Sequence, residues 1–371
     1  MLRQMVFILI FMQAIAFQPR SVIRKSNIRL HRNFNRCNTA ESGVNGEGIG
    51  PLSIEIQQDE IESSDSIASI NPLTIGLPIM GILGYKIAPG PLDALTADVW
   101  HAMYNNPVVQ NPLFEASVAS GSFVAWIVMW SSMHLILGED NTPKWRLDKR
   151  QPVEPFLWVK KENWFMWFNP LFSYMGSIYL YHLIHPHPPL EVVPPTFGHL
   201  SAEVVFGVIL YDLLFYPIHF ALHNAPAKWF RKQHVVHHRW SKSLNAVETV
   251  QHSYIDGFLQ VVVNIIVQQI SPFGGPKHPL SRIIHNIVVT YLLTESHSGY
   301  DLPWMTHYLL PNIFGGAPRH EKHHAGGGRY LQQYFMYLDD AFGTGEPSGV
   351  VVLGKGEGVL VASAVNSTAL G

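Results

Sequence analysis

The sequence predicts an all-α, polytopic membrane protein with about four transmembrane helices and a helical, histidine-lined cap. Three observations support this fold class. Charged residues make up only 14% of the chain and hydrophobic residues 47%, whereas average proteins carry about 25% charged residues. Long stretches without charge recur, and each suits a hydrocarbon core about 30 Å thick. Histidines gather in three clusters between residues 219 and 324.

The composition excludes several kinds of protein. The chain contains a single cysteine, Cys37, so a disulfide framework and a thiolate metal site are both excluded. The formal net charge is −2, whereas nucleic-acid-binding domains are usually basic. We therefore expect no nucleic-acid partner, and we expect any bound metal to be held by nitrogen and oxygen.

Two N-terminal segments are predicted to lie outside the folded domain. Residues 1–40 are the predicted presequence: an apolar stretch ends at Ala14-Ile15-Ala16, and residues 17–37 contain six Lys and Arg residues and no acid. This order resembles a bipartite plastid presequence, and an ordinary secretory signal or an uncleaved anchor is the alternative. Residues 41–70 are polar and acidic, which is typical of a disordered linker.

Residues 71–200 are predicted to contain the N-terminal membrane helices. Ala116–Leu137 has no Asp, Glu, Lys or Arg and matches the length of a membrane span. Trp164–Ile184 is a second candidate, rich in aromatic residues. The segment between them, Glu139–Glu162, is rich in Lys and Arg, so we expect it on the side of the membrane that bears the active site, or at least on the basic side.

Residues 201–346 are predicted to form the catalytic domain, and residues 347–371 a flexible tail. Ala202–His223 reads as a long apolar helix that ends in the first histidine cluster. Gly257–Ile270 and Ile283–Thr294 are apolar but short for independent spans, so we expect them to form a helical hairpin that enters the membrane.

The three histidine clusters are the strongest signal in the chain. Their patterns are H-x3-H, H-x2-H-H and H-x2-H-H, formed in turn by His219 and His223; by His234, His237 and His238; and by His320, His323 and His324. Residues three or four apart lie on one face of a helix, so each cluster can direct its imidazoles at one point. Eight histidines exceed the needs of one four-ligand site, and two metal ions account for the number better.

These residues favour oxygen chemistry on a lipid. A membrane site with two metals and open positions suits iron, and iron with dioxygen supplies an oxidant for an unactivated C–H bond. The apolar helices would bring a lipid-soluble substrate to that site. Four nearby acids are candidates to accept hydrogen bonds from the histidines and fix their tautomers: Glu295, Asp301, Glu321 and Asp339.

The chain from about Ala202 to Gly345 resembles the fatty acid hydroxylase/sterol desaturase superfamily, the membrane di-iron oxygenases with histidine boxes. The three clusters occur in the family's order. In addition, Gln251–Gln260 resembles the segment after the second box of C-5 sterol desaturases, and Glu295–His307 resembles the sterol hydroxylase pattern before the third box. The resemblance implies a membrane enzyme with a di-iron helical cap that uses O2 to hydroxylate or desaturate a lipid, either a sterol or a fatty acyl chain.

The resemblance also implies cofactors and partners. Two iron ions are expected, held by the eight clustered histidines together with His252 and His297, which match further family histidines. No catalytic residue is expected beyond these ligands. An external electron donor is expected: cytochrome b5 if the protein lies in the endoplasmic reticulum membrane, or ferredoxin if it lies in a plastid membrane.

Two alternatives belong to other function classes. His320-Glu321-Lys322-His323-His324 satisfies the H-E-x-x-H pattern of zinc metalloproteases, in which the glutamate is the general base. However, a protease would not need the five clustered histidines that precede it. A membrane metal carrier is the other alternative, but carriers tend to place polar residues within their spans, whereas these clusters stand at the ends of apolar stretches.

Overall fold

The computed structural model describes residues 85–86, 88–149, 171–187, 189–238 and 244–345. In these ranges the chain is helical and forms no strand beyond two isolated bridges, Arg146 with Tyr300 and Phe314 with Phe335. The all-α prediction is confirmed for this part of the chain. The predicted presequence (1–40), linker (41–70) and tail (347–371) lie outside the described residues, as do residues 164–170 of the second predicted span.

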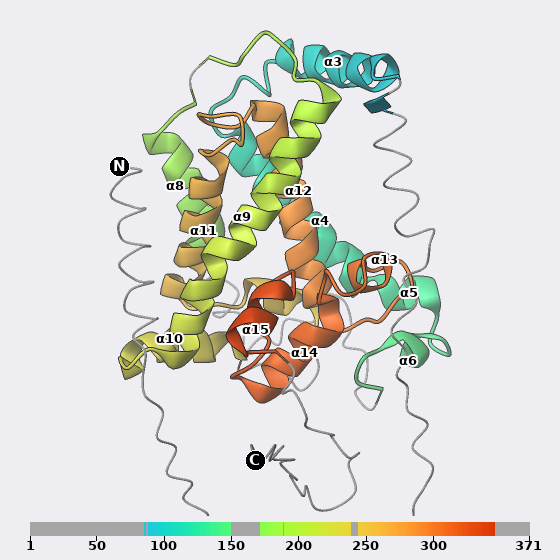
Figure 1. Ribbon diagram of the computed structural model, residues 1–371, viewed down its shortest axis with the longest axis vertical. Helices are drawn as coiled ribbons and strands as arrows, with labels where there is room; N and C mark the ends of the chain where they lie inside the picture. The colour runs from blue at the N-terminus through green and yellow to red at the C-terminus, as the bar shows by residue number, and fades with distance from the viewer. Residues whose placement is uncertain (1–84, 87, 150–170, 188, 239–243, 346–371) are drawn as a thin grey trace, which may run out of the picture. The chain divides into compact units, whose positions relative to one another are not determined.

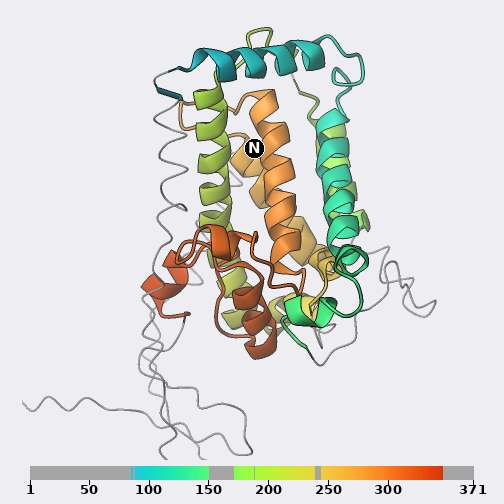
Figure 2. The same ribbon diagram turned by 90° about the vertical axis from the view of Figure 1, so that its right-hand side faces the viewer.

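The helices divide into a bundle and a cap. The bundle helices run side by side (Figure 1) and are α4 (Phe114–Ser131), α8 (Ser177–Ile184), α9 (Phe197–Asn224), α11 (Tyr254–Gln268) and α12 (Pro279–Ser296). Helix α3 (Gly90–Tyr104) lies across one end of the bundle, and the cap lies at the other end (Figure 2). We define the cap as α10 (Lys228–His238), α13 (Thr306–Leu309), α14 (Gly316–Gly326) and α15 (Tyr337–Phe342). Short elements complete the described chain: α5 (Met133–Leu137), α6 (Thr142–Trp145), the π-helix η2 (Leu171–Gly176) and the 3-10 helix η3 (Ala246–Val250).

Helix α9 connects the bundle to the cap. At its start the Thr196 hydroxyl oxygen accepts a hydrogen bond from the His199 N–H at 3.1 Å, which satisfies one donor of the first turn. The helix then continues through Pro217 to Asn224. The predicted apolar helix over Ala202–His223 is thus confirmed, and it begins earlier, at Phe197.

Two helical stretches are long and apolar enough to cross a membrane: Phe114–Leu137, which joins α4 and α5, and α9. Helices α11 and α12 lie beside them as the predicted hairpin, and the Asn264 and Gln268 amides of α11 both donate to the Asn286 side-chain oxygen of α12. Helix α11 has only 15 residues, and α12 carries several buried polar side chains. The total of four spans therefore remains a prediction.

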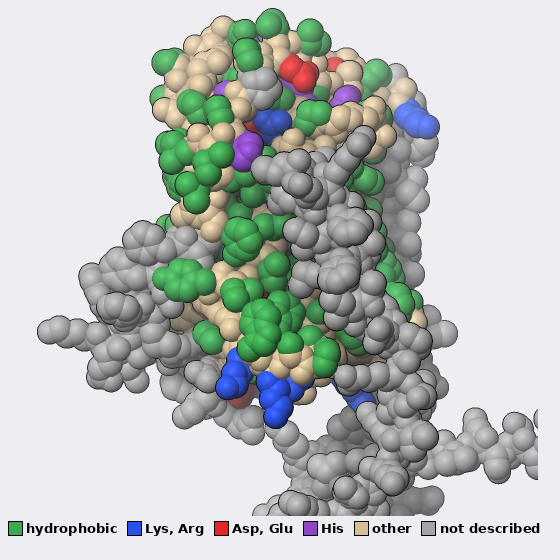
Figure 3. All heavy atoms as spheres, turned by 90° about the vertical axis from the view of Figure 1, so that its left-hand side faces the viewer, with side chains coloured by type: hydrophobic (Ala, Val, Ile, Leu, Met, Phe, Trp, Pro, Cys, Tyr) green, Lys and Arg blue, Asp and Glu red, His purple; other side chains and the backbone are tan. Residues whose placement is uncertain are grey.

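Some buried polar groups of the bundle are paired across helices, which lowers the cost of burying them in an apolar environment. The Arg282 guanidinium of α12 donates from Nε to Glu115 Oε2 of α4 at 2.9 Å, and both residues are buried. In contrast, Val205, Ile209 and Leu213 of α9 point outward and are exposed. One side of the molecule accordingly presents many hydrophobic side chains (Figure 3).

The described part of the basic segment lies against the cap end of α12. The Leu147 N–H donates to the Gly299 carbonyl at 3.1 Å, and the Asp301 N–H donates to the Trp145 carbonyl at 2.8 Å. Between them, the buried Arg146 guanidinium donates to the Ser298 carbonyl at 3.2 Å. This places residues 145–147 at the histidine end of the bundle, and the side of the membrane on which the basic segment lies stays a prediction.

Candidate metal centre

Nine of the ten predicted histidines form two groups where the bundle meets the cap. The first histidine group contains His219, His223, His234, His238 and His323, and the second contains His237, His297, His320 and His324. Within each group the ring nitrogens that face one another all lie within 4.8 Å. The structure therefore offers two separate sets of nitrogen donors.

The helix period explains how two clusters serve both groups. On α10, His234 and His238 are four residues apart and belong to the first group, while His237 belongs to the second. On α14 the assignment is reversed, because His320 and His324 belong to the second group and His323 to the first. Consecutive residues on a helix are rotated by about 100°, so each H-x2-H-H motif presents rings to two sites.

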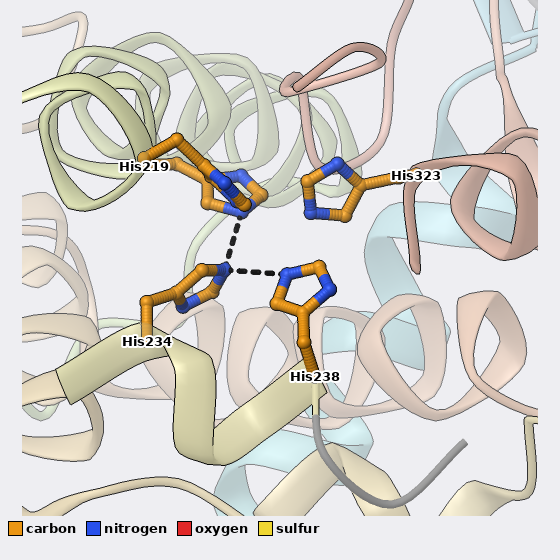
Figure 4. Close-up of side chains that lie close together, drawn as sticks. His219, His234, His238 and His323 are labelled. Carbon is orange, nitrogen blue, oxygen red and sulfur yellow. Dashed lines mark hydrogen bonds between the residues drawn. The ribbon is translucent and has the colours of Figure 1, made fainter. Parts of the chain in front are cut away.

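The ring nitrogens of each group converge. In the first group, His234 Nε2 lies 2.9 Å from His219 Nε2 and 3.0 Å from His238 Nε2. Figure 4 shows His219, His234, His238 and His323 turned toward one another from α9, α10 and α14. In the second group, His297 Nε2 lies 3.1 Å from His237 Nε2 and 2.8 Å from His320 Nε2.

The other ring nitrogen of several histidines is held by an acceptor. His219 Nδ1 lies 2.6 Å from the Leu331 carbonyl oxygen, His297 Nδ1 lies 2.8 Å from that of Leu293, and His323 Nδ1 lies 2.7 Å from that of Arg329. A carbonyl oxygen only accepts, so each Nδ1 carries the proton and each Nε2 keeps a lone pair. This is the usual way in which a protein orients histidine for a metal.

The geometry fits a metal ion in each group. His219 and His234 both have Nδ1 held by an acceptor, so their Nε2 lone pairs face each other at 2.9 Å, which is repulsive unless a cation binds both. Two nitrogens about 2.1 Å from one ion and at right angles lie about 3.0 Å apart. In addition, His223 Nε2 and His323 Nε2 are buried without a hydrogen-bond partner among the described residues.

The cap histidines are held in the neutral form that a metal requires. The pKa of each of four cap histidines is well below its usual value: His237, His320, His323 and His324. Burial is the largest cause, and the neighbouring histidines lower the pKa further. The same causes lower the pKa of His238 to about 3. These rings are therefore unprotonated, with a lone pair available, near neutral pH.

Asp256 on α11 is a site residue that the sequence interpretation missed. Its carboxylate accepts a hydrogen bond from His234 Nδ1 at 2.7 Å and lies 3.4 Å from His252 Nδ1. The His252 ring lies 4.3 Å from the His237 ring, but its Nε2 is directed at the Thr249 carbonyl oxygen. His252 belongs to neither group, so its role as an iron ligand remains a prediction.

Three of the four predicted acceptors hold groups other than the clustered histidines. Glu295 accepts hydrogen bonds from the N–H and hydroxyl of Thr306 at 2.8 and 2.6 Å, and Asp301 pairs with His307 at 2.9 Å. Asp339 accepts from two N–H groups of the segment that carries the Leu331 carbonyl. Glu321 Oε2 has no hydrogen-bond partner among the described residues.

Asp212, which the sequence interpretation also missed, fastens the same segment to α9. Its buried carboxylate accepts hydrogen bonds from the N–H groups of Gln333, Tyr334 and Phe335 at 3.0 to 3.1 Å and from the Gln332 side chain at 2.6 Å. Because this segment also supplies the Leu331 carbonyl to His219, Asp212 positions a cluster histidine indirectly. A lone aspartate in an apolar helix was the available signal.

Two cavities adjoin the histidines. A cavity of about 10 Å³, roughly the size that one water needs, lies between the groups and is lined by His219 and His234 of the first and by His237, His297 and His320 of the second. A larger cavity of about 420 Å³ is lined by His223, His234, His238 and His324 and by apolar side chains of α9, α10 and α14. The two groups are thus neighbours, and both can be reached from the larger cavity.

Comparison with known proteins identifies relatives of this chain. A model of the fatty acid hydroxylase family matches residues 204–344. A cholesterol 25-hydroxylase-like protein of Danio rerio is 32% identical over 218 residues, which cover 56% of this chain and 83% of that protein. The cholesterol 25-hydroxylase of Rattus norvegicus is 28% identical over 186 residues, 47% of this chain and 58% of that protein. A putative methylsterol monooxygenase of Dictyostelium discoideum is 31% identical over 153 residues, 40% of this chain and 53% of that protein. No solved structure matches the chain.

Proposed function

Because the chain belongs to the fatty acid hydroxylase family and is an O2-dependent lipid oxidoreductase, we propose that it is a membrane di-iron enzyme that hydroxylates a sterol. The two groups of converging histidines carry this proposal. The relatives named as cholesterol 25-hydroxylases and a methylsterol monooxygenase support a sterol over a fatty acyl chain, and hydroxylation over desaturation.

In this proposal each histidine group binds one iron ion, and bound iron supplies the activation of dioxygen. The chain's own residues orient the ligands. The Leu331, Leu293 and Arg329 carbonyls hold protons on Nδ1 of their histidines, and the Asp256 carboxylate does the same for His234. His252 is proposed as a further ligand that would need a change of ring orientation.

The larger cavity is the proposed site for the reacting end of the lipid. Leu222, Val235 and Ala325 give it apolar walls, and His238 and His324 line it as well. Its volume of about 420 Å³ lies in the range of small-molecule pockets. An apolar wall beside the metal ligands binds hydrocarbon and excludes water from the reacting carbon.

Hydroxylation also determines what else the enzyme needs. One oxygen atom of O2 enters the C–H bond and the other leaves as water, so each turnover consumes two electrons and two protons. We propose an external electron donor, either cytochrome b5 with the protein in the endoplasmic reticulum membrane or ferredoxin with the protein in a plastid membrane. The presequence expected over residues 1–40 favours the second pairing.

Product formation by purified protein tests the function. With O2, a reductant and a sterol, the wild type should form a hydroxysterol, and His219→Ala should abolish product because a first-group ligand is lost. Hydroxysterol formation by His219→Ala at the wild-type rate would refute the proposal.

The same assay separates the proposal from the metalloprotease and metal-carrier alternatives, neither of which the family or the relatives support. Glu321→Gln would abolish a zinc protease by removing its general base, whereas the hydroxylase should keep measurable activity. Peptide cleavage that is lost in Glu321→Gln and kept in His219→Ala would favour the protease.

A further inference from the structure

Helix α10 presents a cationic face to solvent on the side opposite to its histidines. Lys228, Trp229 and Lys232 are exposed, and we call these three residues the α10 face. The histidines that α10 gives to the two groups are buried or half-buried. The chain from Asn224 to His238 contains no Asp or Glu, so the α10 face has no acid of its own helix to neutralise it.

The other described elements do not pair the positive charge of the α10 face either. Among the described residues, no ion pair joins Lys228 or Lys232 to a carboxylate. Arg231 adds a third cation at the edge of the larger cavity, where its guanidinium is fixed by the Ala225 carbonyl. In contrast, Arg319 of α14 is neutralised by Asp339 and Asp340 at 3.6 and 3.2 Å.

The α10 face is close to both histidine groups. Helix α10 supplies His234 and His238 to the first group and His237 to the second, and a helix with its side chains is about 10–12 Å across. A protein seated on the α10 face is therefore separated from both groups by little more than one helix. Helix α3 lies at the other end of the bundle, much farther from the histidine groups than α10 does (Figure 1).

We propose that the α10 face is the docking surface for an acidic one-electron carrier protein. This inference rests on the proposed function, because that reaction consumes two electrons and the chain has no thiolate pair to supply them. Trp229, 61% exposed, provides the apolar contact. Lys228 and Lys232 provide the charged rim that steers an acidic partner.

The position of the α10 face suits a partner that arrives from water. Figure 3 shows the side of the molecule on which α10 lies, with Lys and Arg side chains at the lower edge of a surface rich in hydrophobic side chains. Basic residues at the end of an apolar surface lie where the chain leaves the hydrocarbon region. A water-soluble carrier can reach them without entering lipid.

Binding measurements on the full-length protein in nanodiscs of neutral lipid test the docking surface. The probes are the soluble domain of cytochrome b5 and a plant-type ferredoxin, both acidic one-electron carriers. At low salt, the carrier should associate with the Lys228→Glu/Lys232→Glu variant about tenfold or more slowly than with the wild type. Added salt should remove this difference between the variant and the wild type. The matched control is Lys86→Glu/Lys144→Glu, which makes the same change in net charge at exposed lysines outside α10 and should change association less than twofold.

The remaining outcomes would overturn the inference. They are an equal effect of the two double variants, unchanged association in Lys228→Glu/Lys232→Glu, or no binding of either carrier to the wild type. A variant that loses binding to phosphatidylserine vesicles and keeps carrier binding would show that the α10 face binds lipid headgroups instead. Iron content is measured in parallel. Wild-type protein without iron would contradict the proposed function. Wild-type protein that contains iron, with carrier association that the Lys228→Glu/Lys232→Glu change does not alter, would contradict only the docking surface.

Discussion

Asp256 contacts the first histidine group directly and lies beside a neighbour of the second. Its carboxylate contacts His234 of the first group directly. It also lies 3.4 Å from His252, whose ring packs against His237 of the second group. All three histidines and Asp256 itself are buried, so their orientation depends on protein contacts and not on water.

Replacing Asp256 by Asn should weaken iron binding with little change of shape. The amide cannot take a negative charge and accepts the His234 proton less strongly, and loss of such a partner typically lowers metal affinity or activity by about 10- to 100-fold. Iron titration of Asp256→Asn measures the effect. Asp301→Asn, which removes the partner of His307 outside both groups, is the control and should retain iron; equal affinity in the two variants would contradict this role of Asp256.

The lowered histidine pKa values predict how the metal-free protein responds to acid. His237, His320 and His323 have a pKa well below 6.5 when folded, and His238 about 3, whereas unfolded histidine titrates near 6.5. Below about pH 6.5 the unfolded chain therefore binds more protons than the folded chain, and stability falls as the pH falls. Thermal unfolding of chelator-treated protein should show a decreasing Tm from pH 7 to pH 5. A flat profile would show that these rings are not buried as neutral groups.

At the scale of elements, the sequence predicts what each helix carries but not how the helices divide their ligands. The H-x3-H and H-x2-H-H spacings indicated rings on shared helix faces, and nine of the ten predicted histidines do converge. The assignment of His237 to one group and His234 to the other depends on how α10 is oriented against α9 and α14. That orientation is set by packing between distant segments, so spacing within one helix cannot reveal it.

Helix α12 shows why boundaries were harder to predict than the elements themselves. The apolar run Ile283–Thr294 indicated a short segment, but the helix extends over Pro279–Ser296. Polar residues at its start, such as Ser281 and Arg282, reduce its hydrophobicity although they are buried. Arg282 is neutralised by Glu115 of α4, a partner more than a hundred residues away in the sequence.

The contact between α9 and α12 requires a glycine at position 207. A Cβ at Gly207 would meet Lys277 Nζ and lie 2.5 Å from His285 Nδ1, and both side chains are buried. Gly207→Ala should therefore destabilise the bundle by about 1–3 kcal/mol through overpacking, measured as a lower Tm in detergent. Gly121→Ala on α4, where nothing lies within 4 Å of a Cβ, is the matched control, and an equal Tm for the two variants would refute the requirement.

At the scale of the whole molecule, the apolar bundle and the polar cap each supply part of the histidine ligands. Candidate membrane spans such as α9 carry the first histidines to the end of the bundle. The cap then supplies the other ligands from α10 and α14. The cap suits these ligands because burying an imidazole costs free energy unless the ring has a hydrogen-bond partner. The loop carbonyls of Leu331 and Arg329 are such partners.

The composition was sufficient to predict the helical class, because a low charge content and long apolar stretches favour membrane helices. It was not sufficient for Asp212 and Asp256. Their roles depend on partners brought close by folding: the loop that holds the Leu331 carbonyl and the His234 ring. Neither partner follows from the local sequence pattern.

Iron content is the measurement that tests the central claim most directly. Protein purified in detergent should contain about two iron ions per chain if each histidine group binds one. His323→Ala, in the first group, and His237→Ala, in the second, should each lower this to about one, and the double variant should contain almost none. One zinc ion per chain that survives His237→Ala and is lost with His324→Ala would contradict the di-iron account and support the metalloprotease alternative.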